Sequence, residues 1–339
     1  MTLNNQKYLV GVRCYTYNHA LYIKEALNGF CMQETNFPYV CTIFDDASTD
    51  GEQEEIRNYL AEHFEAPFRT VDTEYANIIF SRHKTNKNCD FIVFLLKYNH
   101  YSIKKPKLQY LSELQLDFKY VAFCEGDDYW CDTLKLQKQA EFMESHSDYV
   151  LCVHETKLIR YIDGENNKIN SSDLPQTLFL NITYDLDASA EDMILTKVWP
   201  HFSSLMIRNS IWPIPKCFYV QESADWQLLM YASMTGKVRL MKDVMSVYRQ
   251  GVEGSYTQRM RTNVAAKILH HQHKAEMLKK VMKEYPQYTK YLKEALYKNN
   301  KQLCRISSDN SYMSEFSTFY RFSLSIKNLG RRIKRKFLK

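Results

Sequence analysis

The chain has 339 residues, of which 45% are hydrophobic and 25% charged, a composition typical of soluble globular proteins and unlike that of disordered ones. Its net charge of +6 lies in the last 20 residues, where eight Lys or Arg residues and no acidic residue occur, so the slightly acidic remainder is not expected to bind nucleic acid. It has no run of about 18 apolar residues and no signal-peptide pattern at Met1, so we expect neither a membrane-spanning segment nor a signal peptide.

The first predicted elements form a strand, a helix and a second strand. Residues 8–15 are rich in Val and aromatic residues, as strands are, and a helix with an apolar stripe over 23–30 follows them. We expect Asn18 to cap this helix. The second strand, at 39–44, runs into an Asp-rich loop at 45–51. A strand–helix–strand unit of this kind predicts two parallel neighbouring strands.

A third predicted strand carries a cluster of acids at its end. Residues 120–124 are apolar or aromatic, and the run is short enough for a buried central strand. The residues that follow are Glu125, Gly126, Asp127 and Asp128, with the glycine permitting a tight bend. Carboxylates so close together repel one another unless a cation lies between them, and a divalent ion that also binds substrate phosphates is the expected occupant. The alternative is a solvated acidic loop before a helix.

The rest of the chain adds elements around these motifs. We expect helices and strands at the following ranges: helices at 52–64, 108–116 and 222–234, and strands at 68–71, 149–153, 202–207 and 238–247. A lysine cluster, Lys104, Lys105 and Lys107, could face a pyrophosphate, although a solvated face is the commoner role of lysines. From Gln258 onward the Lys-, Leu- and Met-rich pattern indicates appended helices.

Taken together, the motifs resemble those of the family-2 glycosyltransferases of bacteria, over roughly residues 7–256. The motifs occur in the family's order: Thr16-Tyr17-Asn18, Asp45-Asp46-Ala-Ser-Thr-Asp50-Gly51, Glu125-Gly-Asp-Asp-Tyr-Trp130, Lys135-Leu-Gln-Lys-Gln139, Asp225-Trp226 and Tyr248-Arg249. The resemblance implies an α/β fold of the GT-A type, a nucleotide-sugar-binding domain with a mostly parallel mixed sheet, plus C-terminal helices. We therefore expect a glycosyltransferase domain at 1–256, a helical region at 257–319 and a basic tail at 320–339.

The resemblance also implies roles for individual residues. Asp127 and Asp128 look like the metal-binding aspartates of the family's DxD-type motif, for Mg²⁺ or Mn²⁺, and either Asp45 or Asp46 would read the base. No histidine follows Arg249, so the third metal ligand stays open. The expected donor-binding residues are Thr16, Tyr17, Asn18, Asp45, Asp46, Glu125 and Asp127.

The predicted reaction is transfer of a sugar from a nucleotide-diphosphate sugar to an acceptor hydroxyl. By resemblance the transfer inverts the anomeric carbon, with Asp225 as the general base and Glu222 as the second candidate. Asp225 could instead be an acid that merely stabilises the start of a helix. Trp226 could cover an acceptor ring, although a core residue that anchors the helix is the more common role.

Two other functions remain open from the sequence. One is a catalytically silent sugar-nucleotide-binding subunit, and the other is a nucleotidyltransferase of similar α/β build, which would need a Gly-rich phosphate loop that the isolated Gly11 and Gly29 do not form. The nine cysteines form no CxxC pair, so we expect reduced thiols in a cytoplasmic enzyme. The family resemblance places such an enzyme in surface polysaccharide synthesis (capsule, O-antigen or lipopolysaccharide), acting on a glycan or lipid-linked glycan.

The basic tail is the last predicted element. In a helix, Phe322, Ile326, Leu329, Ile333 and Phe337 would form one apolar stripe beside the eight cations. Basic amphipathic helices of this kind lie in the interface of anionic membranes, so we expect a peripheral position on the inner face of the cell membrane. The alternative is a solvated tail.

Overall fold

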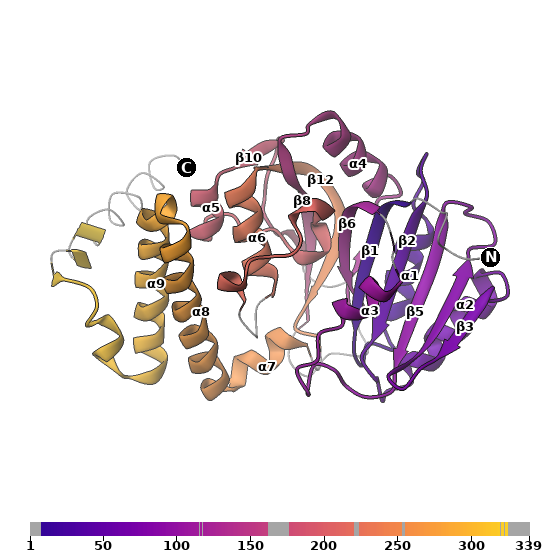
Figure 1. The fold of residues 1–339 in the computed structure, drawn as a ribbon, viewed down its shortest axis with the longest axis horizontal. Helices are drawn as coiled ribbons and strands as arrows, with labels where there is room; N and C mark the ends of the chain where they lie inside the picture. Colours follow the sequence, from indigo (N-terminus) through magenta and orange to yellow (C-terminus); the bar gives the residue numbers. More distant parts are fainter. Residues whose placement is uncertain are drawn as a thin grey trace. The chain divides into compact units, whose positions relative to one another are not determined.

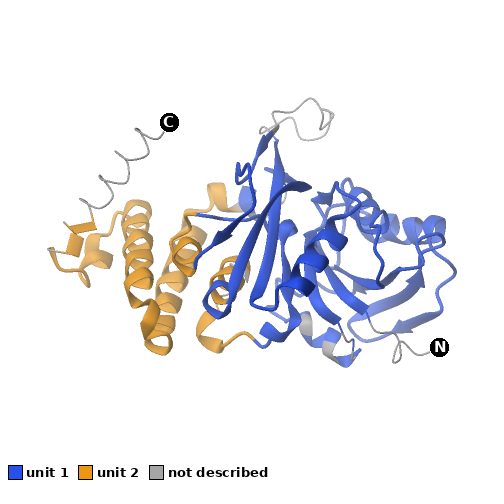
Figure 2. Cartoon of the chain, turned by 90° about the horizontal axis from the view of Figure 1, so that it is seen from above, with its two compact units in different colours: residues 1–189, 198–213, 232–258 blue, residues 190–197, 214–231, 259–339 orange. Residues whose placement is uncertain are grey.

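The computed structural model describes residues 8–114, 116, 118–161, 176–219, 224–252, 255–318, 320–321 and 323–324. The chain forms two compact units (Figure 2). The first unit comprises residues 1–189, 198–213 and 232–258, and the second comprises 190–197, 214–231 and 259–339. The predicted division at residues 256 and 319 remains a prediction, and most of the tail at 320–339 lies outside the described residues.

One mixed β-sheet forms the first unit, in the strand order β10-β12-β8-β11-β6-β1-β2-β5-β4-β3 (Figure 1). Its central strands β6, β1, β2 and β5 are parallel, and antiparallel strands flank them. The strands, in chain order, are β1 (Tyr8–Thr16), β2 (Tyr39–Asp45), β3 (Arg69–Asp72), β4 (Ala76–Arg82), β5 (Cys89–Leu96), β6 (Phe118–Glu125), β7 (Tyr129–Trp130), β8 (Tyr149–Arg160), β9 (Gln176–Leu178), β10 (Leu186–Ala188), β11 (Met206–Arg208) and β12 (Lys237–Gln250). The predicted mixed, mostly parallel α/β sheet is confirmed.

The core of this unit lies between the sheet and its helices. The helices are α1 (Ile23–Cys31), α2 (Glu52–His63), α3 (Leu108–Glu113) and α4 (Lys135–Ser145). Alternate residues of β1, such as Val10 and Val12, are fully buried with Leu27 and Phe30 of α1, as the apolar stripe of that helix predicts. Burying side chains of this size stabilises the fold by about 1.5–3 kcal/mol each.

Several predicted elements differ from the observed ones. No element is predicted from the sequence for residues 76–82, which form β4 between β3 and β5, and the apparent strand at 202–207 divides into a 3₁₀ turn and β11. No element is predicted for residues 155–195 either, and their described part contains the end of β8 and the short strands β9 and β10. These strands are short or paired at the edge, where cross-strand contacts decide the conformation more than local pattern does.

Helices form most of the second unit. These are α5 (Ala190–Ile194), the first part of α6 (Ala224–Thr235), most of α7 (Tyr256–Thr262), α8 (Val264–Glu284) and α9 (Thr289–Ser307). The appended helices predicted after Gln258 are therefore confirmed. Helices α8 and α9 pack side by side (Figure 1) through buried residues such as Leu278, Val281, Leu292 and Leu296. Among the described residues, none of the helices has the length and apolar character that crossing a membrane requires.

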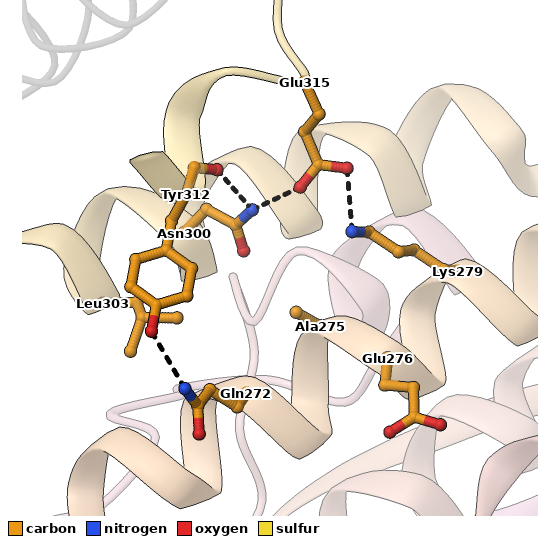
Figure 3. Close-up of a pocket in the computed structure, with 8 residues that line it drawn as sticks. All are labelled: Gln272, Ala275, Glu276, Lys279, Asn300, Leu303, Tyr312 and Glu315. Carbon is orange, nitrogen blue, oxygen red and sulfur yellow. Dashed lines mark hydrogen bonds and ion pairs between the residues drawn. The ribbon is translucent and has the colours of Figure 1, made fainter. Parts of the chain in front are cut away.

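A small pocket of about 220 Å³ lies between α8, α9 and the 3₁₀ turn after them (Figure 3). Its polar side chains bond to one another: Asn300 donates to the Tyr312 carbonyl and to Glu315, and Lys279 pairs with Glu315 at 3.0 Å. Gln272 donates to the Tyr312 hydroxyl. These bonds tie the turn to the two helices and account for the polar lining of the pocket.

Candidate functional site

The carboxyl ends of three neighbouring strands meet at one edge of the sheet. Strand β1 lies between β2 and β6 and is parallel to both, with Thr16 opposite Asp45 and Tyr15 opposite Glu125. The loops after these strands therefore start side by side, as the sequence predicts. The Gly126 amide donates to the Tyr15 carbonyl at 3.0 Å, which joins the acidic turn to β1.

Gly126 is required by a close approach to β1. A Cβ atom on this residue would lie 2.0 Å from the Thr16 hydroxyl oxygen, far inside van der Waals contact. Its backbone is not in the left-handed region, so the bend predicted from glycine's freedom is not the reason for its presence. The absence of a side chain lets the acidic turn lie directly against Thr16.

Asp128 is the fully buried acid of this turn. Its carboxylate accepts hydrogen bonds from the Ser203 hydroxyl at 2.8 Å and from the Arg249 amide at 3.0 Å. Burial raises the pKa of Asp128 well above its usual range, and the neighbouring charge of Asp127 raises it further. A cation at this carboxylate would oppose both effects.

The Arg249 side chain holds the acidic turn in place. Its guanidinium donates to the Asp127 carbonyl at 2.9 Å and pairs with Glu25 at 2.6 Å. It also lies over the rings of Tyr22 and Tyr129, with its central carbon 5.1 and 4.5 Å from their centroids. Only 1% of the side chain is exposed, so these contacts fix the last strand against the turn.

A possible metal site includes a residue that the sequence did not suggest. Ligand atoms of Glu125, Asp128 and His201 lie within 4.8 Å of one another. Burial lowers the pKa of His201 to about 3, so its imidazole is neutral and can offer a ring nitrogen to a metal. The ring is stacked on Tyr248, with centroids 4.0 Å apart. Two carboxylates and a neutral imidazole are a donor set that suits a divalent ion.

Asp127, the other predicted metal ligand, lies outside this cluster. Its carboxylate is 3.7 Å from the Nε2 atom of His19, which lies in the loop after β1. Its side chain is 11% exposed. The role of Asp127 toward a metal stays a prediction.

A buried glutamate joins the first two loops. Glu52, at the start of α2, accepts hydrogen bonds from the Thr16 hydroxyl, from the His19 amide at 2.9 Å and from the Ser48 hydroxyl at 2.8 Å. Burial raises the pKa of Glu52, and the bonds from His19 and Thr16 act in the opposite direction. The Thr16 side chain is thereby fixed at the edge of the sheet.

Asn18 does not cap the first helix, contrary to the sequence prediction. Helix α1 begins at Ile23 without a side-chain cap, and Asn18 adopts a left-handed conformation with φ of 58°. Its side chain accepts from the Thr49 amide at 2.8 Å, and its own amide donates to Ser48 at 2.9 Å. Asn18 therefore ties the first loop to the second, and the adjacent Tyr17 is 37% exposed at this edge.

The two aspartates at the end of β2 have different surroundings. Asp46 accepts the amides of His100 and Tyr101, at 2.8 and 3.1 Å, and pairs with Lys107 at 2.7 Å. Its carboxylate thus holds the loop after β5. Asp45 uses one oxygen to accept from Ser48 and Gln53, whereas its other oxygen, Oδ2, is buried without a partner. Asp45 therefore retains a buried acceptor for a ligand.

The three lysines of the cluster after β5 have different surroundings. Lys107 pairs with Asp46, as described, and Lys105 donates to the Tyr98 hydroxyl at 3.0 Å. Lys104 is exposed. The solvated-face interpretation therefore holds for part of the cluster, whereas Lys107 is bound to Asp46 at the end of β2.

The predicted catalytic residues belong to the second unit. Asp225 lies in the first turn of α6 and accepts the Trp226 amide at 2.8 Å, and burial raises its pKa. Lys274 of α8 lies over the Trp226 ring, 3.8 Å from its centroid, and burial lowers the pKa of this lysine to about 8. Trp226 is 2% exposed, which confirms it as a core residue. Glu222 lies outside the described residues.

The chain is similar to proteins of known sequence and to proteins of known structure. No protein-family model matches it. Uncharacterized proteins of Mycobacterium tuberculosis and Mycobacterium bovis are 29% identical over 250 residues, which cover 72% of this chain and 60% of theirs. The chain thus matches less than two thirds of the length of these relatives.

Solved structures share the fold at low identity. Residues 1–349 of Staphylococcus aureus TarS in complex with UDP-GlcNAc match with a TM-score of 0.57 and 16% identity, covering 92% of this chain and 77% of that one. The mannosyltransferase PcManGT of Pyrobaculum calidifontis, in complex with GDP-Man and Mn²⁺, matches with a TM-score of 0.51 and 15% identity, covering 96% and 81%. The chain therefore has the GT-A fold of nucleotide-sugar glycosyltransferases, as its motifs suggested.

Proposed function

We propose that this protein is a metal-dependent glycosyltransferase that moves a sugar from a nucleotide-diphosphate sugar to an acceptor hydroxyl. The observation that carries the proposal is the buried carboxylate of Asp128, set beside Glu125 and His201 at the carboxyl edge of a GT-A sheet. In sheets of this build, ligands bind beyond the carboxyl ends of the strands. The structure of PcManGT, which shares the fold, is a complex with GDP-Man and Mn²⁺.

Glu125, Asp128 and His201 would hold a divalent ion, Mg²⁺ or Mn²⁺. When bound, such an ion neutralises the charge that develops on the leaving nucleoside diphosphate. The protein supplies the buried carboxylate, the hydrogen bonds that orient it and the Arg249 contacts that fix the turn.

The donor's base would lie at the loops after β1 and β2. Asp45 offers a buried carboxylate oxygen without a partner, which can accept an N–H of the base. Tyr17 offers an exposed ring at the same edge. Thr16 and Asn18 would shape this surface without binding the base, because their side chains are hydrogen-bonded to Glu52 and to the loop after β2.

The acceptor hydroxyl needs a base, and we infer this role for Asp225. Its pKa is raised by burial, which makes a carboxylate a stronger base near neutral pH. The inference depends on the family resemblance of Asp225-Trp226 and on the environment of Asp225 within its own unit. An acceptor in surface polysaccharide synthesis, such as a lipid-linked glycan, follows from that resemblance.

The first prediction concerns the metal ligands. Asp128→Asn should lower Mn²⁺-dependent sugar transfer or donor hydrolysis by about 10³-fold, because a pair of unit charges 4 Å apart contributes about 4 kcal/mol at an effective dielectric near 20. His201→Ala should raise the Mn²⁺ concentration that gives half-maximal activity. Activity would be measured with a panel of UDP- and GDP-sugars while Mn²⁺ is titrated, and with circular dichroism to verify folding.

Asp132→Asn is the control, since this acid follows β7, four residues after Asp128, but pairs with Lys138. The same titration of Asp127→Asn shows whether Asp127 also binds the metal. Full activity of Asp128→Asn in the presence of a chelator would contradict the proposal.

A second prediction separates the two aspartates after β2. Asp45→Asn should weaken UDP binding by about tenfold to a hundredfold, the usual effect of losing a hydrogen bond to a charged group. Asp46→Asn should instead lower the free energy of unfolding, because this carboxylate holds His100, Tyr101 and Lys107. Calorimetry with UDP and denaturant unfolding would measure the two effects. Unchanged UDP affinity in Asp45→Asn would remove this residue from the donor site.

The third prediction tests the base. Asp225→Asn keeps the size of the side chain and its bond to the Trp226 amide, so UDP affinity should be unchanged while transfer falls by about 10²–10⁴-fold. Transfer rates under saturating donor, with Glu222→Gln in parallel, would measure this. Near-normal turnover of Asp225→Asn together with a slow Glu222→Gln would assign the role to Glu222.

A fourth prediction concerns the basic tail. Each cation near an anionic membrane contributes about 1 kcal/mol, so half of the eight would hold the protein at such a surface. Full-length protein should cosediment with phosphatidylserine-containing vesicles and not with phosphatidylcholine vesicles, and a 1–319 truncation should bind neither. Equal sedimentation of both chains with anionic vesicles would show that the tail is not the anchor.

A further inference from the structure

A buried arginine without an acidic partner lies on the face of β1 that points away from α1. Arg13 alternates with the core residues Val12 and Cys14 and is only 7% exposed. Among the residues that the structure describes, none makes a hydrogen bond or an ion pair with its side chain, and its Nε atom is fully buried without a partner. Burial lowers the pKa of its guanidinium. Arginines are almost never buried in this way unless they are paired.

Aromatic rings surround the guanidinium. Its central carbon lies 5.3 Å from the ring centroid of Trp212 and 6.0 Å from those of Phe118 and Phe123. We call Arg13, Phe118, Phe123 and Trp212 the arginine box. The last two distances are at the outer limit of a cation–π interaction, so the rings alone compensate little of the cost of burying the charge.

The box is built by specific features of the chain. Phe118 lies over Gly11, where a Cβ atom would be 2.9 Å from the ring, so this ring position requires the glycine. Phe123 is paired with Arg13 across β6 and β1. Strand β11 pairs with β6 and leads, through a 3₁₀ turn at 209–211, to Trp212. The Nε1 donor of Trp212 is also buried without a partner.

We propose that the arginine box binds the carboxylate of an acidic sugar. The guanidinium matches a carboxylate through two parallel N–H donors. The Trp212 ring, whose centroid lies 5.3 Å from the guanidinium carbon, carries a further donor that has no partner. Trp212 is a partly exposed residue, and its ring would offer a flat face for the C–H groups of a pyranose.

The single charge of the box decides between carboxylate and phosphate. A phosphate monoester carries a charge of about −1.5 to −2 near pH 7, and one buried arginine would leave part of it uncompensated. A carboxylate carries one negative charge, which Arg13 neutralises. Among the described residues, burial and the neighbouring Tyr15 shift the pKa of the guanidinium, and no second cation does.

The position of the box relates it to the proposed transferase. Arg13 precedes Thr16 by three residues on β1, which is roughly 10 Å along a strand. The choice of a sugar as the carrier of the carboxylate rests on the proposed function. The binding of the anion itself does not depend on the metal cluster.

Calorimetry on the full chain, with sodium D-glucuronate as the probe, tests the proposal. Glucuronate should bind more tightly than D-glucose or acetate, because only it combines the anion and the ring. Arg13→Met should weaken glucuronate binding by at least tenfold, and Trp212→Phe, which keeps a ring but loses the donor, by a smaller factor. Arg57→Met, at an exposed arginine of α2, is the matched control and should bind like the wild type.

A stability measurement excludes a purely structural role. If Arg13 serves a ligand, Arg13→Met removes an unpaired buried charge, and the melting temperature Tm should stay the same or rise. Glucuronate should raise the Tm of the wild type and not that of Arg13→Met. A lower Tm for Arg13→Met, equal affinity for glucose and glucuronate, or undetectable glucuronate binding at millimolar concentration would overturn the proposal.

Asp128→Asn separates this inference from the proposed function. This variant should bind glucuronate like the wild type, because the box contains none of the metal-cluster residues. Loss of sugar transfer with intact glucuronate binding would leave the box in place, whereas intact transfer without glucuronate binding would remove the box alone.

Discussion

The arrangement of the candidate site depends on keeping the Asp128 carboxylate buried. Removing a charged carboxylate from water costs several kcal/mol, and the cost is higher here because Asp127 lies next in the chain. The surrounding structure meets this cost with donors from distant parts of the chain: the Ser203 hydroxyl before β11 and the Arg249 amide at the end of β12. The same Arg249 binds the Asp127 carbonyl and Glu25. One buried acid thus joins the central strand, the antiparallel part of the sheet and the first helix.

The main features of this edge could be predicted because they are local. Two short apolar runs that each end in acids, at Asp45 and at Glu125, predict parallel strands whose loops meet, and the structure has these strands with β1 between them. Gly126 was identified for the wrong reason. The sequence shows a glycine in a turn, but the collision that excludes a side chain is with Thr16, which is 110 positions away in the chain and adjacent only in the folded sheet.

His201, Glu52 and Asn18 mark where sequence reasoning fails. His201 stands before a short apolar segment that resembles any edge strand, and nothing local relates it to Asp128. Glu52 looks like an ordinary acid in the first turn of a helix, although it is fully buried. Asn18 is a residue type that often caps helices, yet its side-chain carbonyl accepts a hydrogen bond from the Thr49 amide, in the loop after β2. In each case the polar partner is contributed by the tertiary fold.

The two aspartates at the end of β2 differ in how many hydrogen-bond partners they have. One stabilises this edge of the sheet, and the other keeps an acceptor for a ligand. Asp45 is the last residue of β2 and Asp46 the first residue after it, and their side chains have different partners although the sequence makes them look equivalent. The Asp46 carboxylate is consumed by two amides and one lysine, which stabilises the loop beside the site. The Asp45 carboxylate is held by one oxygen only, and its buried second oxygen costs free energy in the absence of a ligand. Arg13 carries the opposite charge and also has one buried atom without a partner, its Nε donor. A ligand that supplies the missing partner of either group recovers free energy that folding leaves unsatisfied.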